Sequence, residues 1–428
     1  MNIFFDANVQ YVLAGCMLFG LASGVLGCFA FLRRRALLGD AIAHAALPGV
    51  CLAYLVTQNK HPAVFIVGAA VTGLAGSFAV NGISRWSRIK EDAAIGIVLS
   101  VFFGFGIMLL TYIQHQPFGN QSGLDKFLFG QAASLVGKDV QVFAILTFIL
   151  LVGVVFFYKE FKVIAFDRTF AEVIGIPIGW MDAALTLLIV LVVTTGLQAV
   201  GVVLMAAMLI TPAAAARQWT QRLATMLLLA GLFGALAGAA GAIASTLAPR
   251  MPTGPWIVIA VTAFFAVSIA FAPQRGMLAR WWRHRQQSMR VNLENILRTL
   301  YRLREEEGDA AFSLDQIRRF RHLSVRQMLH FLGMLKRQGL VEPQAQPDRW
   351  RLTALGVTRA AELVRRHRLW EVYLSRYLHL DSHHVHADAE EMEHIITPEI
   401  EAELEHLLAH PRRDPHDQPI PVGSGGPR

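Results

Sequence analysis

Two residues whose side chains can bind a metal ion stand four positions apart in an otherwise apolar stretch. Asp40 and His44 lie within residues 36–50, where every other residue is aliphatic, Gly or Pro. Four residues of an α-helix turn through about 400°, so the two side chains fall on one face, a turn apart. An ionisable pair in an apolar helix normally faces a bundle interior or an aqueous cavity, and a carboxylate with an imidazole can ligate one divalent transition metal. The alternative is that Asp40 caps a helix near the membrane surface and His44 hydrogen-bonds a neighbour.

A second group of potential metal ligands lies near the C-terminus. Its members are histidines and glutamates at helical spacing on two segments. They are His367 and Glu371 on the first segment, and His386, Glu390, Glu393 and His394 on the second. Two helices that each present imidazole and carboxylate groups predict a site for Mn, Fe or Zn. The alternative is a solvated acidic helix that happens to contain histidines.

The elements that carry these groups differ sharply in composition. Up to about Pro273 the sequence consists of long apolar runs rich in Gly and Ala, and beyond it no run is long enough to cross a bilayer. This change predicts a membrane domain, residues 1–273, followed by a soluble part. The net charge of +8 does not indicate nucleic-acid binding, because membrane proteins carry excess Lys and Arg in their cytoplasmic loops.

Apolar runs of about 20 residues predict nine membrane spans in an all-α bundle. They lie at 10–32, 37–57, 62–82, 93–114, 139–158, 180–196, 198–216, 223–247 and 254–272. The loops after the odd-numbered spans carry basic clusters such as Arg33–Arg35, whereas the opposite loops hold only Lys60, Lys126, Lys138 and Arg250. The expected location is the cell membrane (the plasma or inner membrane). The positive-inside rule therefore places the N-terminus on its outer side and the C-terminal part in the cytoplasm.

One cytoplasmic loop predicts a docking surface. Residues 161–177 form an amphipathic segment with a glycine helix stop at Gly175, and an exposed helix between two spans can bind a cytoplasmic partner. The sequence contains no Gly-x-x-x-x-Gly-Lys-[Ser/Thr] motif, so the ATPase of an ATP-driven transporter would be another polypeptide. It also shows no nucleophile–base constellation, which argues against an enzyme.

Six short motifs occur in order along residues 1–275. They are Leu38–His44 with Leu47–Gly49, Glu91–Gly96, Phe127–Gln131, Ala165–Arg168, Val200–Leu204 with Leu209–Ala213, and Pro252–Pro255. Together they resemble the permease subunits of ABC-type manganese/zinc/iron importers. The resemblance implies a homo- or heterodimeric permease, a cytoplasmic ABC ATPase pair and an extracytoplasmic metal-binding protein. It further implies that Asp40 and His44 line the metal path, and that Asp167, Ala171 and Gly175 belong to a helix that couples to the ATPase.

The soluble part begins with a pattern typical of a winged helix. Residues 274–290 are basic and Trp-bearing, which predicts a linker anchored at the lipid headgroups. A helix over 291–307, helices over 313–320 and 324–338, and two strands around the turn 343–348 predict a winged-helix domain, residues 291–358. Basic residues on its second short helix are compatible with DNA binding, although such residues are usually just solvated.

Residues 291–421 resemble the iron-dependent repressor family, with a winged helix followed by a helical metal-binding and dimerisation domain at 359–421. Matching positions include Leu300–Leu303, Gly339–Val341, Leu352–Gly356, His367–Glu371, His386–Glu390, Glu393-His394, and Asp414–His416 with Pro419–Pro421. Residues 422–428 are expected to form a disordered tail.

The resemblance assigns the potential ligands to two metal sites. It groups His367, Glu371 and His386 in one site, and places Glu390, Glu393 and His394 in the other. Asn295 would complete this second site, at a position where relatives carry Asp or Met, and because a neutral amide oxygen is a weaker ligand the site is expected to be tuned to lower affinity. Glu390 stands where iron-sensing relatives carry Cys, which favours manganese.

These observations predict the permease of a divalent-metal ABC importer with a cytoplasmic metal-sensing domain. The rival hypothesis is a membrane-tethered transcriptional regulator that senses metal and binds DNA. Against the rival, the membrane half is far more elaborate than a tether requires.

Overall fold

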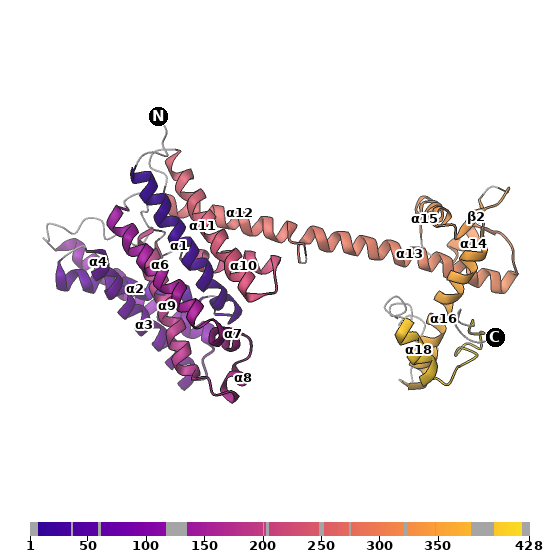
Figure 1. Cartoon of the computed structure of the whole chain (residues 1–428), viewed down its shortest axis with the longest axis horizontal. Helices are drawn as coiled ribbons and strands as arrows, with labels where there is room; N and C mark the ends of the chain where they lie inside the picture. Colours follow the sequence, from indigo (N-terminus) through magenta and orange to yellow (C-terminus); the bar gives the residue numbers. More distant parts are fainter. Residues whose placement is uncertain are drawn as a thin grey trace. The chain divides into compact units, whose positions relative to one another are not determined.

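The computed structural model describes most of the chain as two compact units, Met1–Arg280 and Trp281–Arg428 (Figure 1). The described residues are 7–35, 37–58, 61–116, 135–199, 201–202, 205–247, 252–273, 275–320, 323–346, 348–377 and 398–421. Each unit has its own hydrophobic core, so each is treated separately below.

The first unit is a bundle of α-helices. Its helices are α1 (Ala7–Leu32), α2 (Leu38–Thr57), α3 (Pro62–Trp86), α4 (Glu91–His115), α6 (Gly137–Phe156), α7 (Tyr158–Phe166), α8 (Arg168–Val173), α9 (Ile178–Ala199), α10 (Met205–Trp219), α11 (Leu223–Thr246) and α12 (Thr253–Phe271). Among the described residues, eight of these helices are long and apolar enough to cross a membrane. The all-α membrane bundle is therefore confirmed, whereas the count of nine spans is not.

The predicted seventh span corresponds to α10, which is too short. Its 15 residues rise by about 22 Å, less than the roughly 30 Å of a bilayer's hydrocarbon core. Gly196 of α9 packs against both Phe19 and Met205, and Phe19 lies near the middle of α1. The chain therefore turns back beside the middle of α1, and a run of apolar residues alone does not reveal such a turn.

Small residues bring α1 and α11 into close contact along the middle of the bundle. A Cβ atom on Gly20 would collide with the backbone of Gly234, and one on Gly24 would collide with the carbonyl group of Ala230. Because the two residue numbers change in opposite directions, the helices are antiparallel. Such close approach is how membrane helices pack when lipid is as apolar as their side chains.

The helix directions place several helix ends at one face of the bundle. Ser23 Oγ donates a hydrogen bond to the Met208 carbonyl at 2.9 Å, and Gly27 packs against the Leu209 carbonyl, so α10 runs parallel to α1. Gly241 of α11 packs against Ile257 and Phe233 stacks on Phe264, with ring centroids 5.9 Å apart, so α12 runs antiparallel to α11. Consequently the C-terminal ends of α1, α10 and α12 share the face at which α11 begins.

The second unit begins with a three-helix and three-strand arrangement. Its elements are α13 (Met277–Glu307, whose first residues belong to the first unit), β1 (Phe312–Ser313), α14 (Leu314–Arg318), α15 (Val325–Arg337), β2 (Val341–Pro343), β3 (Arg349–Leu352), α16 (Ala354–Tyr377) and α18 (Pro398–Leu407). The antiparallel sheet has the order β1-β3-β2, with Phe312 opposite Trp350 and Val341 opposite Leu352. This is the predicted winged helix, with one strand, β1, that the sequence pattern did not reveal. Helix α13 begins at Met277, so it includes most of the predicted linker.

Local sequence signals explain where these helices start and stop. Ser313 and Ser324 each form a capping box with the glutamine three residues later, which satisfies backbone N–H groups at the starts of α14 and α15. Gly308 and Gly339 follow α13 and α15 with φ angles of +84° and +71°, a conformation that glycine adopts without strain.

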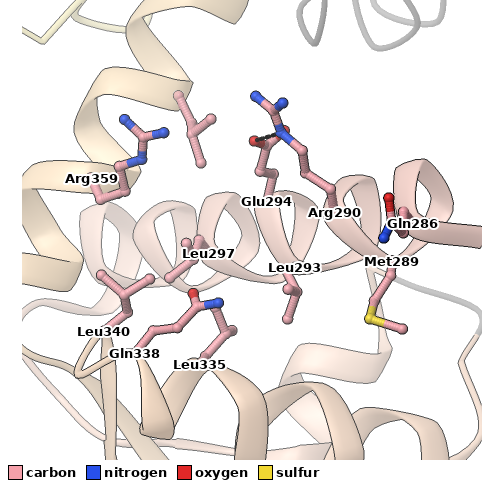
Figure 2. Close-up of a pocket in the computed structure, with 11 residues that line it drawn as sticks. Gln286, Met289, Arg290, Leu293, Glu294, Leu297, Leu335, Gln338, Leu340 and Arg359 are labelled. Atoms are coloured by element: carbon pink, nitrogen blue, oxygen red, sulfur yellow. Dashed lines mark hydrogen bonds and ion pairs between the residues drawn. The ribbon is translucent and has the colours of Figure 1, made fainter. Parts of the chain in front are cut away.

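Helices α13, α15 and α16 line a pocket of about 310 Å³ on the winged-helix part (Figure 2). Leu293 and Leu297 of α13 and Leu335 of α15 form its apolar lining, and the ion pair between Arg290 and Glu294 lies at its edge. Among the described residues, none of the predicted metal ligands lines this pocket.

Two arginines of α16 hold the C-terminal segment in place. Arg365 pairs with Glu401 at 3.1 Å and Glu405 at 2.5 Å on α18, and it donates to the Pro421 carbonyl at 2.7 Å. Arg368 makes two hydrogen bonds to Glu305 of α13, at 3.0 and 2.7 Å, and one to the Pro419 carbonyl at 2.6 Å. Helix α16 therefore connects the end of α13 to the last described residues.

Candidate functional site

The Asp40–His44 pair lies in the first two turns of α2, the helix whose apolar face is buried among α3, α4 and α9. The distance from His44 Nε2 to Asp40 Oδ1 is 3.6 Å, and the two side chains are 13% and 26% exposed. At 3.6 Å the contact is too long for a good hydrogen bond, so the Asp40 carboxylate keeps lone pairs that can face a cation. The predicted juxtaposition of a carboxylate and an imidazole on one helix face is present.

The surroundings of His44 are otherwise apolar. Its ring packs edge-on against Phe103 of α4, with centroids 4.7 Å apart, and its Nδ1 atom is buried with no hydrogen-bond partner among the described residues. A buried polar nitrogen without a partner is costly, which favours a ligand-binding role over a packing role. Since α2 begins close to the Arg33–Arg35 loop, the pair lies near the face that the basic loops mark, rather than at the middle of the bilayer.

The predicted docking helix consists of two short helices, not one. Asp167 lies between α7 and α8, where its Oδ1 accepts a hydrogen bond from the Phe170 N–H at 2.9 Å and so caps α8. Ala171 is fully buried in a small cluster with Ile164 and Ile178. Gly175, with φ at +81°, follows the end of α8. The three predicted coupling residues thus define the cap, the buried side and the end of α8.

Asp182 is a charged residue of this region whose importance sequence reasoning missed. Its Oδ1 pairs with Arg33, just after α1, and its Oδ2 lies 3.1 Å from Nη2 of Arg168, the first residue of α8. The sequence did carry a signal, because Asp182 is the one charged residue in the apolar segment of α9. A carboxylate at such a position needs partners, and here it joins α8 to the end of α1.

In the tail, His367 and Glu371 lie four residues apart on α16, as expected. His367 Nε2 is 3.1 Å from Glu371 Oε1, and the two side chains are 6% and 2% exposed. The other ring nitrogen, His367 Nδ1, lies 3.0 Å from Nη1 of Arg298 on α13. The pair is therefore buried at a contact between α13 and α16.

The remaining tail ligands fall mostly outside the described residues. His386, Glu390, Glu393 and His394 all lie in the segment 378–397, which the structure does not describe. Within the described part of the chain, no three His, Cys, Asp or Glu residues come together as a metal site. Asn295, which is 7% exposed, has a buried Oδ1 atom with no described partner. A buried imidazole–carboxylate pair and an unpaired amide oxygen fit a hard or borderline divalent cation.

Comparison with known proteins finds a separate family match in each half of the chain. Residues 6–272 match the ABC 3 transport family, and residues 353–422 match the iron dependent repressor, metal binding and dimerisation domain. The manganese transport system membrane protein MntC of Bacillus subtilis is 46% identical over 373 residues, which cover 87% of this chain and 85% of that protein. The zinc transport system membrane protein TroC of Treponema pallidum is 44% identical over 289 residues, covering 68% of this chain and 97% of that protein.

A solved structure also resembles the chain. The structure of PsaBC from Streptococcus pneumoniae in complex with Fab matches with a TM-score of 0.58 and 32% identity, covering 64% of this chain and 95% of the matched chain. From its membrane helices and these matches, the chain belongs to the ABC 3 transport family, and it carries a repressor-type metal-binding and dimerisation domain after those helices.

Proposed function

We propose that the chain is the permease subunit of an ATP-driven importer for a divalent transition metal, and that its tail senses the same metal in the cytoplasm. The observation that carries the proposal is the Asp40–His44 pair, with atoms 3.6 Å apart and an unpartnered His44 Nδ1 in an apolar helix. Family membership supplies the transport function. The names of the relatives, which specify manganese and zinc, support the class of substrate.

The transported metal ion is the ligand that the Asp40–His44 pair binds on its way through the membrane. A carboxylate and an imidazole replace part of the hydration shell of the ion, and a single pair of ligands binds weakly enough to release it. The position of the pair near the basic face makes it a late step of import. Thr57, at the other end of α2, lies about 20 Å further along the helix axis at 1.5 Å per residue.

The partners follow from the same proposal. A separate ABC ATPase dimer binds the α7–α8 segment, a second permease subunit completes the path, and an extracytoplasmic metal-binding protein delivers the ion. The basic loops support an orientation with Arg33 and the tail on the cytoplasmic side of the cell membrane and the N-terminus outside. Helix α12 and the end of α1 reach the same face, which supports this orientation.

The tail residues would hold manganese as a regulatory ion, with iron or zinc as the alternatives. His367 and Glu371, with His386, would form one site, and Glu390, Glu393 and His394, with Asn295 as a weak ligand, would form the other. A bound ion would supply positive charge among these imidazole and carboxylate groups. Of these, His367 and Glu371 provide buried nitrogen and oxygen donors at the contact between α13 and α16.

The experiment that tests the transport function is metal uptake by membranes that contain the chain, its ATPase and its binding protein. Because loss of an outer-shell partner alone commonly costs 10- to 100-fold, His44→Ala and Asp40→Asn should each lower uptake of manganese or zinc by about 100-fold. Leu52→Ala, an exposed change on the same helix, is the matched control and should transport normally. Normal uptake by a correctly inserted His44→Ala protein would refute the assignment.

A further inference from the structure

Both nitrogens of the His367 ring are already engaged by protein groups. Arg298 Nη1 lies 3.0 Å from Nδ1, and Glu371 Oε1 lies 3.1 Å from Nε2. The His367 and Glu371 side chains are more than nine-tenths buried, so water does not substitute freely for these contacts. A metal ion that binds His367 must therefore disturb at least one of them.

The chemistry of Arg298 decides where the ring proton is. A guanidinium is always protonated and can only donate hydrogen bonds, so Nδ1 must be the acceptor. A neutral imidazole with an accepting Nδ1 carries its proton on Nε2, which then donates to Glu371 Oε1. In this arrangement neither nitrogen has a lone pair available to a metal ion, which requires an unprotonated and unoccupied nitrogen.

The Arg298 contact and metal ligation exclude each other at either nitrogen. An ion at Nδ1 takes the place of the Arg298 guanidinium directly. An ion at Nε2 forces the ring proton onto Nδ1, which can then no longer accept a hydrogen bond from Arg298. We propose that Arg298 is an internal cation that competes with a divalent metal for His367, so that metal binding to the tail releases the Arg298–His367 contact between α13 and α16.

The composition of α13 supports a site that metal occupies only at high concentration. Asn295 lies one turn before Arg298 on this helix, so at these two positions α13 offers a neutral amide and a guanidinium but no carboxylate. A fixed positive charge also repels a divalent cation across the buried site. The proposal rests on the metal-sensing function proposed above and adds what sets its threshold.

The test is a Mn²⁺ titration of the full-length protein in detergent at one fixed pH, with free Mn²⁺ measured by its electron paramagnetic resonance signal. Binding that disappears in His367→Ala defines the tail site. Arg298→Ala and Arg298→Gln should bind Mn²⁺ there at least about tenfold more tightly than the wild type, because the competing charge is gone. Arg298→Lys keeps a cation and should stay near wild type. Arg302→Ala is the matched control, since Arg302 lies one turn on and pairs with Glu306 at the surface.

Each outcome decides the proposal. If the wild type binds Mn²⁺ and both Arg298→Ala and Arg298→Gln bind it no more tightly, the competition is overturned. The metal-sensing proposal then remains. Equal weakening by Gln and Lys would make Arg298 a purely structural residue, which also overturns it. Absence of any His367-dependent binding in every variant would reject the tail metal site and the competition together. The Gln variant keeps most of the side-chain volume, so it carries the test where Ala impairs folding.

Discussion

At the scale of single residues, charges that lie among apolar helices have defined partners. Asp182 holds Arg33 with one carboxylate oxygen and Arg168 with the other, and the side chains of Arg33 and Asp182 are 11% and 20% exposed. By contrast, Arg168 is 54% exposed. The Arg33 contact should therefore contribute most of the stabilisation, because exposed ion pairs contribute little.

Asp182→Asn should uncouple ATP hydrolysis from transport. Loss of the carboxylate frees α8 from the end of α1, and loss of a hydrogen bond to a charged group costs about 2 kcal/mol. The measurement is the number of metal ions imported per ATP hydrolysed, which should fall although the ATPase still co-purifies. Asp182→Glu should restore most of the ratio, and Arg168→Ala should lower it less than Arg33→Ala. A proportional fall of both rates would instead indicate a general loss of folded protein.

A second prediction at this scale concerns acid stability of the tail. Hydrogen bonding by Arg365 is the main cause that lowers the pKa of Glu405 from its ordinary value of 4.5; burial opposes the shift, and His410 adds to it. Since the pKa is lower in the folded state, the stabilisation is fully present above pH 4.5 and is lost as the pH falls through the folded pKa.

Hydrogen exchange of peptides from α18 in the full-length protein measures this loss. Exchange should speed up as the pH falls below about 4.5 once the intrinsic pH dependence is removed, and Glu405→Gln should abolish that acid-dependent part. Glu403→Gln, an exposed neighbour, is the control. An unchanged acid response in Glu405→Gln would contradict the prediction.

At the scale of elements, α7 and α8 show how a docking surface is built from very few residues. Helix α8 has only six residues, so it depends on the Asp167 cap, on the buried Ala171 and on the turn at Gly175. Short helices are unstable alone and need such tertiary support. Its outward residues Phe170 and Val173 are exposed and available to a partner.

Changes beneath α8 should weaken binding of the ATPase without removing any exposed contact residue. Asp167→Ala removes the cap, at about 1 kcal/mol, and Ala171→Leu overfills a buried cluster, at about 1–3 kcal/mol. Co-purification of the ATPase should fall several-fold in both variants, and Glu172→Gln, which is exposed, should leave it unchanged. Crosslinks from the ATPase that map to residues 83–92 alone would move the docking site there.

The elements also show what could be predicted from the sequence and what could not. Apolar runs predicted most of the membrane bundle, and the helices predicted at 291–307, 313–320 and 324–338 correspond to α13, α14 and α15. A turn was predicted between the sixth and seventh spans, but its depth beside Phe19 was missed because a short helix that starts inside the bundle has the same composition as one that crosses. Strand β1 was missed because two residues carry no periodicity.

The sequence likewise predicted some contacts of the candidate sites and not others. Spacing within one helix predicted the Asp40–His44 and His367–Glu371 pairs, because residues four apart on a helix must be neighbours. The pairing of Arg298 with His367 joins positions 69 residues apart, and the pairing of Arg33 with Asp182 joins positions 149 apart. Such contacts depend on the tertiary fold, and local spacing contains no information about them.

At the scale of the whole molecule, a permease and a metal-binding domain share one chain. Eight described membrane helices exceed what a tethered DNA-binding regulator needs, and the family match covers residues 6–272. A tail that binds the imported ion can act as a brake. Bound metal can shift the equilibrium between two conformations of the tail only as far as its affinities for those two conformations differ. The proposed competition by Arg298 is one source of that difference.

The most direct test of this account is a transport titration in membrane vesicles, with metal varied on the cytoplasmic side. The full-length chain should import manganese or zinc at low cytoplasmic metal and slow as the metal rises. Deletion of residues 291–428 and the variant His367→Ala should leave import active but shift inhibition to at least about tenfold higher metal, or remove it. Identical inhibition curves for all three proteins would show that the tail has no sensing role in transport, and absence of import by all three would contradict the permease assignment itself.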